Sequence, residues 1–377
     1  MIDPALELLN EFQRDIPILH FRVLVEKYES RLIEIEPFQT IQNSWVWLPM
    51  GVGSIGSSLP FNAVYGLLRS GRRPEAILET ARREVADNAY PVQEVRSVRG
   101  ISLNRRIDLE KGVYLLPNSE LRRTSEHGVA FGNSMLGRSF PTDIAALVME
   151  AQVSPAIEAS YDGRAKPDQG QAERQEYARL FKLALALTMR VPVTMQHTYA
   201  IASDDSLFGQ TGSALNSTTD YPIFAPEALL VSADGVVQVM HKLRNMQNSE
   251  ALELSIDRLL KSRVDSNLED TLIDLGMAAE IALMHSPSGS GDGKAEITNK
   301  ISTRAAWLLG ANSKERLEIS KMIRLLYTSR SVVVHTGRAK ATIVKEIDGL
   351  DELVTRMLRA ILDRGSFPDW TALVLGG

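Results

Sequence analysis

The chain has 377 residues, of which 44% are hydrophobic and 24% are charged. This ordinary globular composition excludes a mainly disordered, collagen-like or coiled-coil protein, and the length favours two domains. The net charge of −5, from 42 basic and 47 acidic residues, argues against a generally basic nucleic-acid coat. A binding site for a polyanion must therefore be local.

The residue types that hold metals and disulfides are scarce. The sequence contains no cysteine, which excludes a disulfide framework, a thiolate zinc site and a cysteine nucleophile. None of the six histidines has the H-x-x-x-H or H-E-x-x-H spacing of a metal site. We therefore expect neither a metal nor another cofactor.

Two stretches bear on localisation. Met1–Ala5 has neither the basic region nor the apolar core of a signal peptide. Leu180–Leu187 is the most apolar short stretch, but it contains a lysine and is far shorter than the roughly 20 residues of a membrane span. We expect a soluble, cytoplasmic protein that makes no membrane contact.

Residues 1–245 predict a mixed α/β domain. Helical spacing covers Pro4–Gln13 and Glu173–Met189, and another helix is expected after Arg72–Glu75. Ala228–Val231 and Val236–Val239 flank a short turn and predict a hairpin, although the second run is also compatible with the start of a helix. The remaining expectations are three strands, at Trp45–Leu48, Gly112–Leu116 and Val191–Thr194, and a surface loop at Tyr161–Gln171.

Residues 246–377 predict an all-helical bundle, so the fold class expected for the whole chain is α+β. A Gly- and Ser-rich connector, Ser286–Gly293, separates the second helix from the third. Ser313 is expected to be the N-cap of the fourth helix, and Gly337 is placed to end it. The five expected helices are Ser249–Arg263, Asn267–His285, Lys294–Leu309, Ser313–His335 and Ala341–Arg364.

One cation interrupts the apolar stripe of the fourth helix. Arg330 lies within about 20° of Ile319 at 100° per residue, so it occupies a position where an apolar side chain is expected. A buried arginine is costly unless it is paired, and the simplest interpretation is a buried or interface salt bridge. The apolar stripe consists of Ile319, Met322, Ile323, Leu326 and Val333.

Other polar residues gather near Arg330. Ser331 and His335 form an i, i+4 pair, and the helix dipole favours the protonated form of a histidine in the last turn. Arg330 and His335 are about 7–8 Å apart along the helix axis, so both side chains could reach one phosphate. Residues 314–345 include eight Lys or Arg and two Glu. This excess is also compatible with an ordinary solvated helix face.

The stretch Ile323–Gly337 resembles the R-x4–6-H signature of HEPN domains, and is closest to the ApeA-like branch. The residues that carry the resemblance are Leu326-Tyr327 and then Arg330-Ser331-Val332-Val333-Val334-His335-Thr336-Gly337. Leu272–Glu280 and Arg304–Gly310 resemble flanking parts of the same domain, and the resemblance covers about residues 250–365. In the first part, Arg99–Leu103 and Gly112–Leu115 resemble, with low specificity, the partner domain of such proteins.

The resemblance implies a metal-independent endoribonuclease in which the ribose 2′-OH attacks the adjacent phosphorus. Arg330 and His335 would be catalytic, Ser331 would assist, and two copies would build the site as a homodimer. Arg324, Arg338 and Lys340 could steer the RNA phosphates. The resemblance also suggests a role as a toxin or in antiviral defence by abortive infection, with residues 1–245 sensing a phage-derived trigger or regulating the nuclease.

Two other functions stay open. The first is a catalytically silent HEPN module that binds a nucleotide or a protein, and the second is a toxin whose antitoxin is a nucleotidyltransferase. Glu280 and Arg304 lie on or beside apolar stripes and are expected to form a buried structural ion pair, unless one of them supports Arg330.

Two further motifs are expected to be coincidental. Gly51–Gly56 matches the G-x-G-x-x-G pattern, but Pro60 follows closely and no βαβ unit is expected there. Gly132–Gly137 misses the G-x-S-x-G pattern of serine hydrolases by one residue.

Overall fold

The structure is a computed structural model, in which the chain forms two compact units. Unit 1 comprises residues 1–97, 110–175 and 196–219, and unit 2 comprises residues 98–109, 176–195 and 220–377. The predicted division at residues 245 and 246 falls inside unit 2 and stays a prediction. The structure describes residues 3–47, 53–55, 59–122, 127, 130–131, 144–160, 170–210, 215–217, 228–264, 267–285 and 297–375.

Unit 1 begins with a group of helices that share one apolar core. The Phe12 ring stacks on those of Tyr28 and Phe61, with centroids 4.4 and 5.4 Å away, and all three side chains are buried. Asp3 caps the first helix by accepting a hydrogen bond from the Ala5 N–H. These helices are α1 (Pro4–Asp15), α2 (Phe21–Ile33), α3 (Phe38–Gln42), α4 (Leu59–Arg69) and α5 (Pro74–Asp87).

A small antiparallel sheet accompanies these helices. Its strand order is β2-β1-β7, with β1 at Trp45–Trp47, β2 at Gly53–Ile55 and β7 at Ile157–Glu158. The strand expected at Trp45–Leu48 is therefore confirmed over its described residues. The middle of the G-x-G-x-x-G match lies in β2, which pairs antiparallel with β1 and so is not the turn that opens a helix in a dinucleotide site.

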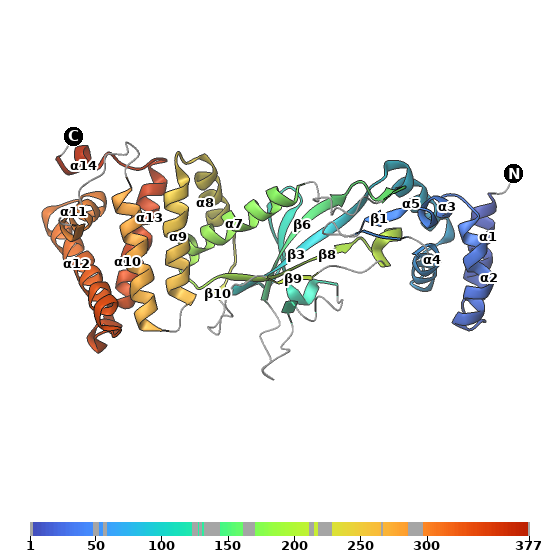
Figure 1. Ribbon diagram of the computed structural model, residues 1–377, viewed down its shortest axis with the longest axis horizontal. Coiled ribbons are helices and arrows are strands. Elements are labelled where there is room, and N and C mark those ends of the chain that lie inside the picture. The colour runs from blue at the N-terminus through green and yellow to red at the C-terminus, as the bar shows by residue number, and fades with distance from the viewer. Residues whose placement is uncertain are drawn as a thin grey trace. The chain divides into compact units, whose positions relative to one another are not determined.

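The larger sheet has seven strands in the order β4-β5-β6-β3-β8-β9, and β10 pairs with β3 in parallel. Figure 1 labels β3, β6, β8, β9 and β10 of this sheet. The expected hairpin is wrong: Ala228–Leu229 pairs with β3, and the second apolar run lies in a helix, as the alternative allowed. The expected strand at Val191–Thr194 begins only at Thr194. The strands are β3 (Tyr90–Ser102), β4 (Ile107–Glu110), β5 (Val113–Pro117), β6 (Ile144–Val153), β8 (Thr194–Ala202), β9 (Leu215–Ser217) and β10 (Ala228–Leu229).

A buried carboxyl group holds one connection in unit 1. Glu84 on α5 is 1% exposed, and its Oε2 accepts a hydrogen bond from the Leu207 N–H at 3.0 Å. Leu207 begins the short helix η2 (Leu207–Gln210), which packs on α4 and α5. Burial raises the pKa of Glu84 to about 7, and the Ser206 and Leu207 hydrogen bonds only partly offset this effect.

This raised pKa predicts a stability that depends on pH. The unfolded state ionises Glu84 near pH 4.5, so stability is lost as the pH rises from there to about 7. Glu84→Gln keeps the acceptor for the Leu207 N–H and removes the ionisation. We expect the variant to be more stable than wild type by about 1–3 kcal/mol at pH 8 and nearly unchanged at pH 4.5, measured by urea unfolding. An equal difference at both pH values would contradict the assignment.

Unit 2 contains the helices of the second half of the chain, so the described structure confirms the α+β fold class. α10 lies between α9 and α12, and α11 packs on α12 (Figure 1). The helices are α7 (Gln171–Met189), whose first turn belongs to unit 1, α8 (Asp234–Asn245), α9 (Ser249–Val264), α10 (Leu268–Met284), α11 (Ile297–Leu309), α12 (Ser313–Thr336), α13 (Ile347–Asp363) and α14 (Trp370–Leu375).

Two predicted helix boundaries need correction. The N-cap of α12 is Asn312 and not Ser313, because the Asn312 side chain accepts the hydrogen bond from the Glu315 N–H. The expected helix Ala341–Arg364 starts with a 3-10 segment, η3 (Ala341–Glu346), and becomes α-helical only in α13. Two predicted loops and one predicted motif fall on residues outside the described part of the chain, at 161–169, 286–293 and 132–137.

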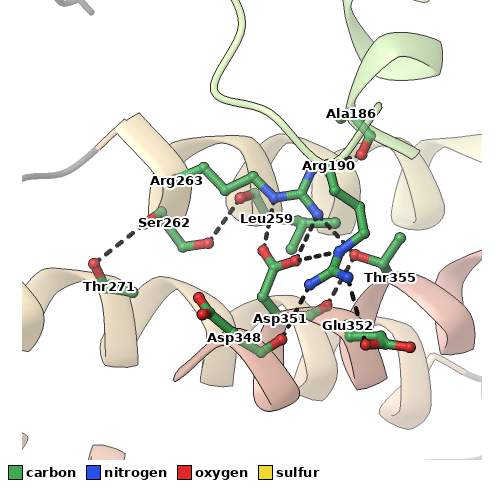
Figure 2. Close-up of polar contacts among 10 residues, drawn as sticks. All are labelled: Ala186, Arg190, Leu259, Ser262, Arg263, Thr271, Asp348, Asp351, Glu352 and Thr355. Atoms are coloured by element: carbon green, nitrogen blue, oxygen red, sulfur yellow. Dashed lines mark hydrogen bonds and ion pairs between the residues drawn. The ribbon is translucent and has the colours of Figure 1, made fainter. Parts of the chain in front are cut away.

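A buried ion pair joins three helices of unit 2 (Figure 2). The Arg263 guanidinium on α9 binds both oxygens of Asp351 on α13, with Nε–Oδ2 at 2.6 Å and Nη2–Oδ1 at 2.9 Å. The same guanidinium donates to the Thr355 hydroxyl at 2.7 Å and to the Ala186 carbonyl of α7 at 2.5 Å. The Arg263 side chain is only 7% exposed, and its partners satisfy each of its nitrogens.

Candidate functional site

α12 positions the residues for which the sequence predicts chemistry. The helix begins at the Asn312 cap and ends at Gly337, whose φ of 69° confirms the predicted terminating glycine. Its apolar stripe turns inward, because Ile319, Ile323, Leu326 and Val333 are all buried. Arg330 continues that stripe, so its side chain extends toward α10 and not into solvent.

Arg330 makes an ion pair within the same chain. Its Nη1 lies 2.5 Å from Oε2 of Glu280 on α10, with the two side chains 22% and 31% exposed. The Tyr327 hydroxyl donates to the same oxygen at 3.3 Å, and the Arg330 Cζ lies 5.4 Å from the Tyr327 ring centroid. Burial and the Glu280 carboxylate raise the pKa of Tyr327, which keeps the hydroxyl protonated as a donor. The simplest interpretation of Arg330, a salt bridge, is therefore observed.

A glycine on α10 makes room for Arg330. A Cβ at Gly276 would overlap the Arg330 Cδ and would lie only 3.2 and 3.3 Å from its Cγ and Cβ. The aliphatic part of Arg330 therefore crosses α10 at the one residue type without a side chain. The Arg330 Nε is buried and has no hydrogen-bond partner in the described part of the chain.

Gly276→Ala tests this close approach. Alanine has the higher intrinsic helix propensity by about 1 kcal/mol, but the new methyl group must displace Arg330. We expect a net loss of about 1–3 kcal/mol in the free energy of unfolding, measured with urea. Gly276→Ala combined with Arg330→Ala should lose less than the sum of the two single changes, and strict additivity would show that the methyl group does not meet Arg330.

The predicted structural pair between Glu280 and Arg304 needs correction. The described contacts of Glu280 go to Arg330 and Tyr327, so it supports Arg330, as the alternative stated. Arg304 on α11 instead donates to the Leu283 carbonyl at 2.7 Å, and its Cζ lies 5.4 Å from the ring centroid of Trp370. Arg304 therefore binds the end of α10 and the α14 segment.

His335 and Ser331 lie on the open side of α12, and both are exposed. Five residues correspond to about 140° around a helix axis, so His335 points away from the face that carries Arg330. In the part of the chain that the structure describes, no hydrogen bond or ion pair reaches the His335 imidazole. The structure therefore does not bring Arg330 and His335 together within one chain.

The predicted RNA-binding cations are all exposed but differ in their surroundings. Arg324 donates to Oδ1 of Asn299 on α11 at 2.5 Å. Arg338 and Lys340 follow the end of α12, where the Glu269 carboxylate accepts the Ala339 N–H at 2.8 Å. That hydrogen bond lowers the pKa of Glu269, so an ionised carboxylate lies among these cations.

One buried acid in the α10 segment has an evident structural role. Asp274 is 2% exposed, and its oxygens lie 3.0 Å from Arg258 Nη1 and 3.4 Å from Lys261 Nζ, both on α9. It therefore fixes α10 against α9. Its neighbour Gly276 has the more specific part in the site, because it admits Arg330.

The described residues contain no group of three or more His, Asp or Glu side chains arranged to hold a metal ion. None of their helices has both the length and the apolar character that crossing a membrane requires. Comparison with models of known protein families, with curated proteins and with solved structures found no match to this chain.

Proposed function

We propose that this protein is a metal-independent endoribonuclease of the HEPN type, with Arg330 and His335 as catalytic residues contributed by two copies of the chain. The observation that carries the proposal is an arginine fixed on the packed side of α12, five residues before an exposed histidine in the last turn of that helix. Among the described residues, this histidine has no hydrogen-bond or ion-pair partner. Exposed cations lie along and after this helix: Arg324 precedes Arg330 on α12, and Arg338 and Lys340 follow the end of the helix.

The proposed RNA cleavage uses these two kinds of side chain. A histidine can accept the proton of the ribose 2′-OH or donate one to the leaving oxygen near neutral pH. An arginine can hold the scissile phosphate and the negative charge that grows on it. Because about 140° separates the two positions on α12, a site that contains both takes the histidine of one copy with the arginine of the other.

The ion pair with Glu280 limits how far Arg330 is available to bind a phosphate. Its carboxylate occupies Nη1, and an RNA phosphate has to replace it or bind the remaining Nη2. During that exchange the Tyr327 ring would stay against the guanidinium, and Gly276 would leave room for the aliphatic part of the arginine. A role as a toxin or in antiviral defence, with a trigger sensed by the first part of the chain, belongs to the same proposal.

A second candidate function is favoured by the ion pair itself. An arginine already neutralised by Glu280 suits a catalytically silent helical module that binds a nucleotide or a protein. In that case Arg330 would be purely structural. His335 would then be an ordinary exposed residue.

RNA cleavage in the presence of EDTA separates the two candidates. The purified chain is incubated with a mixed-sequence RNA, and the product ends are analysed by sequencing. We expect fragments with 2′,3′-cyclic phosphate or 3′-phosphate ends, and no cleavage of DNA, which lacks the 2′-OH. Equal cleavage by wild type and by the His335→Ala variant would exclude the nuclease proposal.

A further inference from the structure

The side of α12 that faces away from α10 carries a straight stripe of polar and cationic side chains. Its positions are three and four residues apart in alternation, which keeps them within about 50° of one line along the helix. All of these residues are exposed, so the packing of α12 leaves the line open to solvent. We call it the α12 stripe; its members are Lys314, Leu317, Lys321, Arg324, Thr328, Ser331 and His335.

The α12 stripe carries positive charge that the described residues do not neutralise. Lys314 and Lys321 are exposed, and no hydrogen bond or ion pair joins either of them to a residue that the structure describes. Arg324 donates to the side-chain oxygen of Asn299, which is a neutral group and leaves the charge of the guanidinium uncompensated. Three cations therefore lie along this line before it reaches His335.

The two carboxylates of α12 lie off the stripe. Glu318 is about 90° away from its centre line around the helix axis. Glu315 turns to the start of α12, where its oxygens accept hydrogen bonds from the Ala311 N–H at 2.9 Å and from the Asn312 side chain at 2.8 Å. An anion bound along the stripe would thus meet cations and hydroxyl groups of this helix and none of its acids.

The composition of the stripe indicates which ligand it suits. A seam between two helices needs apolar side chains at positions with this spacing, and Leu317 is the one apolar member. The stripe has no aromatic ring on which a base could stack. Lysine and hydroxyl side chains can contact phosphate oxygens, which carry no sequence information. The stripe is therefore suited to the backbone of a polyanion and not to a partner helix or to bases.

The three cations all lie on one side of His335 along the helix. At 1.5 Å per residue they are about 17, 21 and 32 Å from it. A strand with stacked bases advances about 3.4 Å per nucleotide, so about nine nucleotides would cover the whole stripe. A strand lying along the stripe would place one phosphodiester at His335 while other phosphates contact the cations.

We propose that the α12 stripe binds a single strand of RNA through its phosphates, without selecting a base sequence, and places one of its phosphodiester links at His335. The choice of RNA rests on the endoribonuclease proposal. In that reaction the 2′-OH must come into line with the leaving oxygen, and an unpaired strand can adopt this geometry more readily than a stacked duplex. Lys314 and Lys321 thereby become RNA-binding residues.

Binding is measured without cleavage by fluorescence anisotropy of 2′-O-methyl RNA of about 12 nucleotides, in which the attacking hydroxyl is blocked. Lys321→Ala should weaken binding about 3- to 10-fold. It should also reduce the slope of log K against log salt by about 0.7, the contribution of one phosphate contact on a single strand. Lys314→Ala combined with Lys321→Ala should reduce that slope by about 1.4.

Lys111→Ala is the matched control, because it removes an exposed lysine from the turn between β4 and β5. Its affinity for the RNA and its salt slope should equal those of wild type. Oligomers of A, of C and of U should bind wild type within about threefold of one another, because the stripe contacts no base edge.

Three results would overturn the proposal. They are an unchanged salt slope in the variant that lacks both lysines, an equal loss of affinity in Lys111→Ala and Lys321→Ala, and a preference of about tenfold or more for one of the three oligomers. The endoribonuclease proposal fails separately. If the slopes change as expected but the chain cuts no RNA, the stripe is an RNA-binding surface without a nuclease, whereas cleavage with unchanged slopes would reject the stripe alone.

Discussion

Arg263→Met is expected to lower the free energy of unfolding by about 3–5 kcal/mol, the cost of leaving a buried charge without its partner. The methionine fills much of the same volume, so the loss is electrostatic and not a packing defect. Asp351, whose side chain is 13% exposed, would lose its bidentate partner and keep Arg190 as its ion-pair partner among the described residues. The Thr355 hydroxyl and the Ala186 carbonyl would each lose a donor. Urea unfolding followed by circular dichroism measures the change.

Arg190→Met provides the control on the same carboxylate. Arg190 Nε lies 3.3 Å from Asp351 Oδ1, but its side chain is 40% exposed (Figure 2). Pairs that water screens contribute about 0–1 kcal/mol. We therefore expect a loss several times smaller than for Arg263→Met. Similar losses for the two variants would mean that water reaches the Arg263–Asp351 pair and that the pair is not buried in solution.

Local patterns predicted the helices of the second half well. α9 begins at Ser249 and α11 ends at Leu309, as the periodicity indicated, and Gly337 ends α12 through its positive φ. Helices of this kind are predictable because an apolar stripe and a cap are encoded within a few turns. The strands were harder to predict: β3 and β6 are buried over most of their length, and such strands lack the alternation that identifies a half-exposed strand.

The candidate site was predictable only in part. The break in the apolar stripe identified Arg330, because helical spacing alone places it on the packed face. The sequence left the partner of Glu280 open, since Arg304 and Arg330 both offered a compatible cation, and only the packing of α10 against α12 selects Arg330. Gly276 has no sequence signal of its own. Its role follows from Arg330 approaching from another helix.

His335→Ala is expected to reduce RNA cleavage by about 10²–10⁴-fold, the usual contribution of a general acid or base. The residue is exposed and makes no bond in the described structure, so its removal should leave the urea midpoint unchanged. Arg338→Ala is a matched control at the same end of α12. This variant should bind RNA more weakly, and its RNA binding should depend less on salt, without a loss of cleavage.

Arg330→Ala should also strongly reduce cleavage, but this single variant is ambiguous because it leaves Glu280 uncompensated. The double variant Arg330→Ala with Glu280→Ala removes both charges and should recover most of the stability lost by the single change. Under the endoribonuclease proposal the double variant is folded and still inactive, since a group that binds the transition state is missing. If restored folding brings cleavage back, Arg330 only holds α10 and α12 together, and the catalytic assignment of this arginine is wrong.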